Sequence, residues 1–214
     1  MDSKAFYKLT YGLYIISSAY KGKTGGCVVN TLAQVTSKPA CMSVAINKDN
    51  YTTQLIEKSG IFAAVVLAQE AGMALIGEFG FKSSKDTDKF AGFKTNTDEN
   101  GLPYVTEQTL ARYSCKVVNK LDLGTHIMFI GEVMEAEVLA AETPLTYTYY
   151  QTVKKGTTPK NAPSYKEDET ALQSSIAKKG YRCTICGYIH ESDTLPEDFI
   201  CPICKATADK FEKL

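Results

Sequence analysis

This sequence of 214 residues has no tryptophan, only two histidines and no excess of charge, since 24 Lys and Arg balance 24 Asp and Glu. A balanced charge disfavours an electrostatic scavenger of nucleic acid. No uncharged stretch reaches the roughly 18 apolar residues of a membrane-spanning helix. The first residues, Met1-Asp2-Ser3-Lys4, lack the cationic and apolar regions of a secretory signal. We therefore expect a cytoplasmic protein with no nucleic-acid and no membrane partner.

The motifs of several enzyme classes are also missing from residues 1–150. No GxGxxG, GxxxxGK or GxSxG pattern occurs there, which leaves a Rossmann domain, a P-loop and an α/β-hydrolase elbow without support. His126 is the only histidine outside residues 181–214. Residues 1–150 therefore offer a single imidazole for general acid or base catalysis.

Seven cysteines are an odd number for a chain without an export signal, so metal binding explains them better than a disulfide framework. Four of them form two CxxC pairs with fourteen residues between the pairs, namely Cys183, Cys186, Cys201 and Cys204. Four thiolates in this pattern make a tetrahedral site for Zn²⁺ or for a single iron, and the spacing alone leaves both open. The other three lie in apolar strand-like contexts typical of the buried core: Cys27, Cys41 and Cys115.

The residues around the paired cysteines favour iron. An aromatic shell keeps water from a redox iron site, and four aromatic residues accompany the cysteines: Tyr181, Tyr188, Phe199 and Phe211. The runs CTICGYIH, LPEDFICPIC and DKFE resemble rubredoxin, and more closely the shortened rubredoxin-like module of rubrerythrins, over residues 181–214. Lys205 stands where that family usually has glycine. A positive φ at this position would cost a non-glycine residue about 1 kcal/mol.

The segment up to about residue 139 has mainly β composition. We predict a hairpin of residues 9–20 and 27–36 joined by the glycines of residues 21–26, because glycines mark tight turns. Further strands are predicted at 42–46, 61–67, 113–118 and 127–138, and short helices at 50–56 and 67–76. At least six strands must cover or remove their edges, which favours a closed or split β-barrel.

Three parts of the barrel region resemble the flavin reductase family of FMN-binding split barrels. They are residues 30–52, residues 85–90 and residues 123–133, and the similarity spans about residues 5–150. Taken alone, the same residues are more typical of a polar turn, a solvated charged face and a histidine at the start of a strand. The resemblance implies a mainly β fold, with an FMN-binding split β-barrel and short helices followed by the rubredoxin-like metal-binding domain.

The same resemblance implies roles for individual residues. The flavin ring and ribityl chain would contact Asn30, Thr31, Val35 and Thr36. The ribityl and phosphate end would be held by Asn47, Asn50, Tyr51 and Thr52, and the phosphate charge would be neutralised by Lys85 and Lys89. His126 would lie beside the flavin, where it hydrogen-bonds the ring or assists the incoming nicotinamide. Thr125 stands before it, where many relatives have Asp.

We expect a flavin reductase-like barrel at 1–150, a linker at 151–180 and a rubredoxin-like domain at 181–214. This combination resembles the high-molecular-weight rubredoxins. It implies that NAD(P)H reduces FMN, that electrons pass singly to a Cys₄ iron, and that iron reduces a partner such as a flavodiiron protein. A homodimer is also implied. Two alternatives stay open: a zinc-ribbon binding module on a flavin-binding barrel, and a reductase that supplies reduced flavin to a separate oxygenase.

Overall fold

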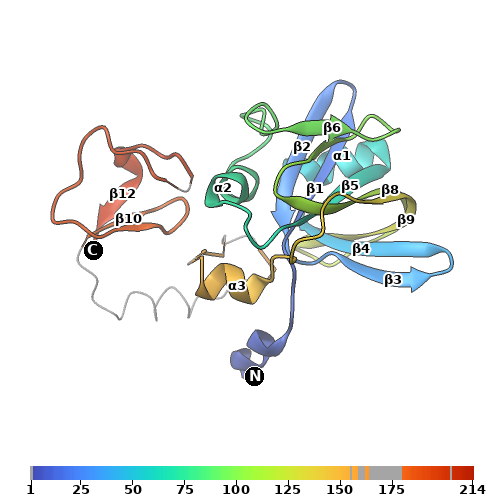
Figure 1. Cartoon of the computed structure of the whole chain (residues 1–214), viewed down its shortest axis with the longest axis horizontal. Helices are drawn as coiled ribbons and strands as arrows, with labels where there is room; N and C mark the ends of the chain where they lie inside the picture. Colours follow the sequence, from blue (N-terminus) through green and yellow to red (C-terminus); the bar gives the residue numbers. More distant parts are fainter. Residues whose placement is uncertain (1, 155, 159–161, 164–179, 203) are drawn as a thin grey trace.

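The computed structural model describes residues 2–154, 156–158, 162–163, 180–202 and 204–214 (Figure 1). Most of the expected linker, residues 159–161 and 164–179, lies outside the described residues. The helices and strands are η1 (Ser3–Lys8), β1 (Tyr14–Tyr20), β2 (Lys23–Val29), β3 (Ala33–Ser37), β4 (Ala40–Asn47), α1 (Tyr51–Ser59), β5 (Ile61–Leu67), α2 (Met73–Phe81), β6 (Thr95–Thr97), β7 (Pro103–Val105), β8 (Thr109–Asp122), β9 (His126–Val138), α3 (Tyr147–Thr152), β10 (Tyr181–Cys183), β11 (Ile189–His190), η2 (Ala208–Lys210) and β12 (Phe211–Lys213).

Seven of these strands form one antiparallel sheet in the order β2-β1-β5-β8-β9-β4-β3. The long strands β8 and β9 lie at its centre, and register shifts along them bend the sheet. A separate three-stranded sheet, β11-β10-β12, belongs to the C-terminal module. The predicted mainly β fold with short helices is confirmed. None of the helices in the described part of the chain combines the length and hydrophobicity that a membrane span requires.

Two hydrophobic cores lie on opposite faces of this sheet, because successive strand residues point to opposite faces. Ile15 and Val65 belong to the core under α2 and α3, which also contains Phe79 and Tyr150. Ile16 and Ala64 belong to the second core, which α1 closes with Ile56. Cys27, Cys41 and Cys115 are buried, as predicted.

The first hairpin differs from the prediction. Its turn is only Lys21 and Gly22, and Gly25 and Gly26 lie inside β2 and pair with β1. The reason is close packing: a Cβ at Gly26 would stand 2.8 Å from the Phe79 ring. Gly25 and Gly26 therefore allow neighbouring side chains to pack directly on the backbone of β2, and they are not part of the turn.

Helix boundaries depend on their surroundings. Helix α1 follows the predicted N-cap, since the side chain of Asn50 accepts a hydrogen bond from the Thr52 amide. Helix α2 begins at Met73, six residues later than predicted, because Leu67 completes β5 and its amide and carbonyl bond the backbone of Leu13 and Leu145. Strands β6 and β7 and helix α3 were not predicted.

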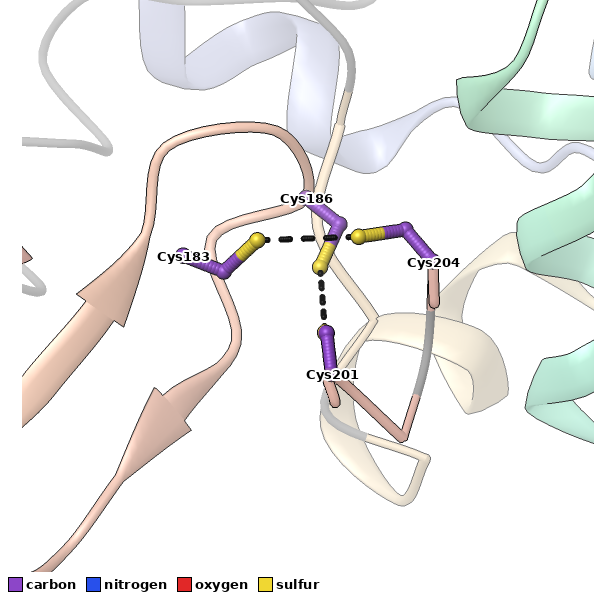
Figure 2. A group of neighbouring side chains, drawn as sticks. All are labelled: Cys183, Cys186, Cys201 and Cys204. Carbon is purple, nitrogen blue, oxygen red and sulfur yellow. Dashed lines mark hydrogen bonds between the residues drawn. The ribbon is translucent and has the colours of Figure 1, made fainter. Parts of the chain in front are cut away.

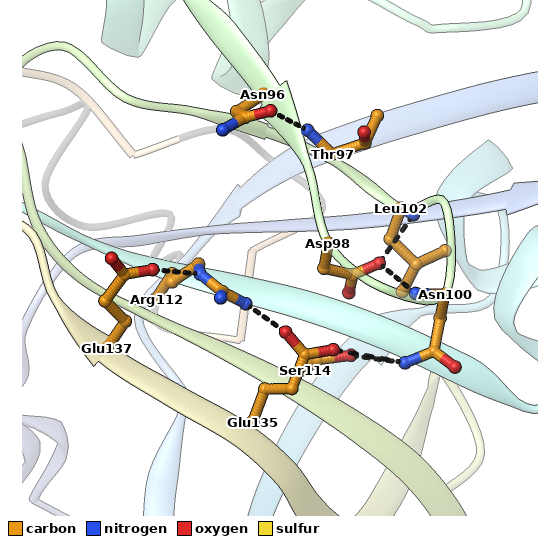
Figure 3. A network of polar contacts seen from close by, with 9 residues as sticks. All are labelled: Asn96, Thr97, Asp98, Asn100, Leu102, Arg112, Ser114, Glu135 and Glu137. Atoms are coloured by element: carbon orange, nitrogen blue, oxygen red, sulfur yellow. Dashed lines mark hydrogen bonds and ion pairs between the residues drawn. The ribbon is translucent and has the colours of Figure 1, made fainter.

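A network around Arg112 fixes the hairpin of β6 and β7 on the main sheet (Figure 3). The Arg112 guanidinium donates to Glu135 and Glu137 on β9, at 2.7 Å each, and stacks 5.2 Å from the Tyr104 ring. Asn100, in the loop between β6 and β7, donates to Ser114 on β8 at 3.2 Å. The hydrogen bonds to Glu135 and Glu137 raise the pKa of Arg112 above its ordinary value.

We predict that Arg112→Met lowers the free energy of unfolding by about 1–3 kcal/mol, because it leaves the mostly buried Glu135 without its cation. Chemical denaturation measures this. The control is Lys120→Met, which breaks an exposed ion pair with Glu57 and is expected to cost less than about 1 kcal/mol. Equal losses in both variants would contradict a structural role for the Arg112 network.

Candidate functional site

The four paired cysteines converge in the C-terminal module (Figure 2). Their four Sγ atoms lie within 4.8 Å of one another, with 3.6 Å between Cys183 and Cys204 and 3.5 Å between Cys186 and Cys201. A tetrahedron with metal–sulfur bonds of about 2.3 Å has sulfur–sulfur edges of about 3.8 Å. The spacing therefore fits a single four-coordinate metal ion.

The two CxxC loops have the same backbone conformation. The Gly187 amide donates to the Cys183 carbonyl, and the Lys205 amide donates to the Cys201 carbonyl. Both Gly187 and Lys205 have a positive φ, at 76° and 61°. This turn directs the next amide of each loop at a sulfur: Tyr188 faces Cys186 and Ala206 faces Cys204. Amide donors to thiolate sulfur are what a redox-active iron site uses to adjust its potential.

The thiols also require a cation for electrostatic reasons. All four are buried, and Phe81, Tyr188 and Phe211 pack around them. Burial raises the pKa of the Cys204 thiol to about 12 and also raises that of Cys186. Four buried thiolates are therefore stable only when a metal ion compensates their charge. The donor set fits iron held by Cys183, Cys186, Cys201 and Cys204.

The positive φ of Lys205 leads to a prediction. We expect Lys205→Gly to stabilise the metal-loaded module by about 0.5–1 kcal/mol, since glycine adopts this conformation without strain. The rate of metal release to a chelator measures the effect. Lys205→Ala is the matched control, because it removes the charge and keeps the strained backbone. If alanine slowed release as much as glycine, charge and not backbone strain would be the cause.

Most of the residues expected at the flavin gather at one end of β4 and β9. Asn47, the last residue of β4, pairs directly with His126, the first residue of β9. Thr31 donates to the Ala45 carbonyl at 2.7 Å, which places Thr31 beside the same end of β4. The hydroxyl of Thr125 lies 2.8 Å from Nδ1 of His126 and fixes the ring. Asn30, at the end of β2, is buried.

Helix α1 begins directly after this end of β4. Asn50 is its N-cap, and Tyr51 and Thr52 form its first turn. Thr52 is completely buried, and among the described residues its hydroxyl has no nitrogen or oxygen partner and only the Cys27 thiol beside it. Helix N-termini favour anions such as phosphate. A buried hydroxyl with only a weak thiol partner at this position fits a phosphate-bearing ligand.

Two expected flavin residues lie away from this group. Val35 and Thr36 are on the edge strand β3, and Thr36 pairs with Cys41, six residues before Asn47 on β4. At about 3.3 Å per residue, this separation is about 20 Å. Both residues are exposed, and the Thr36 hydroxyl donates to the Pro39 carbonyl. The structure does not bring them to the His126 end of the sheet.

The two lysines expected at the phosphate both lie in the segment after α2, but their environments differ. Lys85 is exposed, whereas Lys89 is 3% exposed, and its ammonium donates to the carbonyls of Gly26 at 2.9 Å and Phe79 at 3.1 Å. Lys85 is therefore free to contact a phosphate, whereas the ammonium of Lys89 is engaged by the backbone carbonyls of β2 and α2. The sequence interpretation missed Ser84. Its hydroxyl accepts a hydrogen bond from the Gly26 amide, and both Ser84 and Thr52 lie beside Gly25. A serine pair between Lys82 and Lys85 was its only signal.

Burial of Lys89 leads to a pH-dependent prediction. Removal from water lowers the pKa of its ammonium from 10.5 to about 8. Between these values the unfolded chain holds the proton and the folded chain does not, so this group's contribution to stability rises with pH. Relative to Lys89→Met, we expect the wild-type free energy of unfolding to rise by about 1–3 kcal/mol from pH 7.5 to pH 10. Parallel pH profiles of the two proteins would contradict the assignment, and Lys85→Met serves as the exposed control.

Comparison with known proteins agrees with both parts of this geometry. The family model of the flavin reductase like domain matches residues 6–157, and that of the rubrerythrin, rubredoxin-like domain matches residues 181–212. The chain belongs to the flavin reductase family and carries a rubredoxin-like domain. A flavin reductase domain implies a bound flavin, and a rubredoxin-like Cys₄ site implies iron.

Individual relatives match the whole chain or a large part of it. This flavin reductase family member is 42% identical to high molecular weight rubredoxin from Moorella thermoacetica over the full length of both chains. It is 44% identical to ferric-chelate reductase (NAD(P)H) from Archaeoglobus fulgidus, over 79% of this chain and all of that one. Nitrilotriacetate monooxygenase component B from Mycobacterium thermoresistibile shares the fold, with a TM-score of 0.60 and 23% identity over 67% of this chain and 79% of that chain. The predicted resemblance to high-molecular-weight rubredoxins is confirmed.

Proposed function

We propose that this protein is an NAD(P)H-dependent oxidoreductase in which FMN in the barrel is reduced and electrons leave through the iron of the Cys₄ site. The observation that carries the proposal is the presence, on one chain, of a flavin reductase domain and a complete Cys₄ site with amides directed at sulfur. When bound, a flavin accepts two electrons as a hydride and releases them singly, which suits an iron that exchanges one electron.

FMN is the flavin that the phosphate end of the site favours. The N-terminus of α1, the buried Thr52 hydroxyl and the exposed Lys85 provide a short polar boundary for one terminal phosphate. Asn47 and Asn50 stand on either side of the turn that leads into the helix and offer amides to a ribityl chain. We assign Asn30 and Thr31 to the ring end. Val35 and Thr36 are assigned to flavin contacts on β3, away from the His126 end of the sheet.

His126 is the proposed catalytic residue. Its position opposite Asn47 places the imidazole at the same end of the sheet as the other flavin residues. The Thr125 hydroxyl holds Nδ1, so the ring is oriented before any ligand arrives. In this role the imidazole hydrogen-bonds the flavin edge or positions the nicotinamide for hydride transfer.

A second copy of the chain is the proposed occupant of the exposed edge of the barrel. Every residue of β3 is exposed, and Val35, Val118, Leu121 and Leu123 leave apolar surface uncovered on β3 and around the β8–β9 hairpin. Patches of this kind mark interaction sites. In a homodimer, Val35 and Thr36 would then lie near the subunit boundary.

The proposed electron acceptor is a partner protein, and the resemblance to high-molecular-weight rubredoxins suggests a flavodiiron protein. The relative named ferric-chelate reductase (NAD(P)H) supports a nicotinamide donor and one-electron delivery to iron. The alternative in which reduced flavin is released to a separate oxygenase leaves the Cys₄ site without a role.

Two variants of the flavin site are predicted to behave differently. We expect Lys85→Ala to weaken FMN binding by about 2- to 30-fold, as loss of an exposed charge-assisted contact does. His126→Gln, in contrast, is expected to slow reduction by NAD(P)H about tenfold or more at matched FMN occupancy, with little change in affinity. Fluorescence titration measures binding, and stopped-flow absorbance measures reduction. The opposite pattern would refute both assignments.

The modular proposal is tested at the metal. We predict that Cys204→Ser impairs iron binding and abolishes reduction of an acceptor protein, while reduction of bound FMN by NAD(P)H persists, because the barrel has its own cores. Cys115→Ser, which changes a buried cysteine away from the metal, is the control for thiol substitution. Loss of both activities together in Cys204→Ser would contradict the proposal. Flavin bands without ferric–thiolate absorption in the wild type would favour the zinc alternative.

A further inference from the structure

Gly156 and Thr157, shortly after α3, are held on the barrel by Tyr150. Tyr150 is 3% exposed and belongs to the same hydrophobic core as Phe79. Its hydroxyl donates to the Thr157 carbonyl at 2.9 Å, and its own carbonyl accepts from the Gly156 amide at 2.9 Å. Gly156 lies against the Tyr150 ring, where a Cβ would overlap it. Thr157 is therefore presented at a fixed place on the barrel surface.

Thr157 contacts the first CxxC loop of the C-terminal module. Its hydroxyl donates to the Cys186 carbonyl. Gly187, the next residue, has no side chain at this point, and a Cβ there would stand 3.0 Å from the Thr157 methyl group. The hydroxyl and the methyl group of Thr157 thus both lie against the loop that holds two of the four metal ligands.

Helix α2 forms the second contact between the barrel and the module. Phe81, its last residue, packs against the four cysteines. Phe79, two residues earlier, packs against Gly26 of β2, next to Gly25, Ser84 and Thr52 of the proposed phosphate end. Residues two apart project from opposite sides of a helix. Helix α2 therefore lies between the flavin site and the metal site, as its place in Figure 1 beside the module indicates.

We propose that the Cys₄ module docks on the barrel of its own chain through its first CxxC loop, with Thr157 and Phe81 as positioning residues, and that α2 sets the spacing between metal and flavin. The helix contributes its own diameter, about 10–12 Å, to the distance between the metal and the phosphate end of the flavin site. The consequence for electron transfer rests on the proposed function, whereas the docking itself does not.

A small contact is sufficient because the module is tethered. Residues 158–180, 23 in number, join Thr157 to Tyr181, and 23 residues reach no farther than about 80 Å even when fully extended. A tether of this reach gives effective concentrations in the millimolar range. One hydrogen bond and one aromatic contact then hold the module in place, although they would not hold two separate proteins together.

Photo-crosslinking of the full-length protein loaded with iron and FMN tests the docking directly. A benzophenone side chain replaces Phe81, and equal amounts of ¹⁴N- and ¹⁵N-labelled chains are mixed under conditions that exchange subunits, so that half of any dimers contain one chain of each label. We expect crosslinks to residues 181–190 that join only peptides of the same isotope. Mixed-isotope crosslinks would place the module on the other subunit, and no crosslink to the module would show that it does not dock; either result overturns the proposal. The same group at Glu99, exposed in the loop between β6 and β7, is the control position.

Thr157 variants separate the docking from the proposed function. Thr157→Val is expected to lower the same-chain crosslink yield about 2- to 12-fold, the value of one hydrogen bond, and Thr157→Ser to restore it. Thr152→Val, which removes a hydroxyl bonded within α3, is the control. An unchanged yield in Thr157→Val would overturn the role of Thr157. Crosslinks within one chain, combined with iron that flavin never reduces, would leave the docking intact and refute the proposed function.

Discussion

The close approach of two helices to a glycine pair in β2 is the constraint on which both sites depend. A Cβ at Gly26 would meet the Phe79 ring at 2.8 Å, and one at Gly25 would meet Leu55 of α1 at 2.8 Å. A side chain at either glycine would displace Leu55 of α1, the helix that carries Thr52, or Phe79 of α2, the helix that carries Phe81. Lys89 fixes the same region from inside by joining the carbonyls of Gly26 and Phe79. One short stretch of backbone thus positions the phosphate end of the flavin site and one wall of the metal module.

Local patterns predicted much of the fold and of the metal site. The CxxC spacing fixes four ligands within two short loops, and the positive φ expected at Lys205 is present. Strand β5 and the N-cap Asn50 agree with their sequence signals. Each depends on residues only a few positions apart, where propensity and spacing decide the conformation.

Features that depend on distant partners could not be predicted in this way. The glycines of β2 read as a turn because their partners, Phe79 and Leu55, lie far along the chain. Lys89 has the sequence context of a solvated face, yet it bonds a carbonyl 63 residues away. Residues after 150 read as a linker, whereas Thr157 is fixed by Tyr150 and contacts the Cys186 loop. Burial, and not local composition, decides each of these cases.

The central claim is that flavin and iron on one chain exchange electrons directly, across the helix that separates their sites. Anaerobic stopped-flow mixing with NAD(P)H, monitored at both the flavin and the ferric–thiolate bands, tests it most directly. The account predicts that the ferric–thiolate absorption bleaches after the flavin band, at a rate independent of protein concentration. Iron that stays oxidised beside fully reduced flavin, or a bleaching rate proportional to protein concentration, would contradict it.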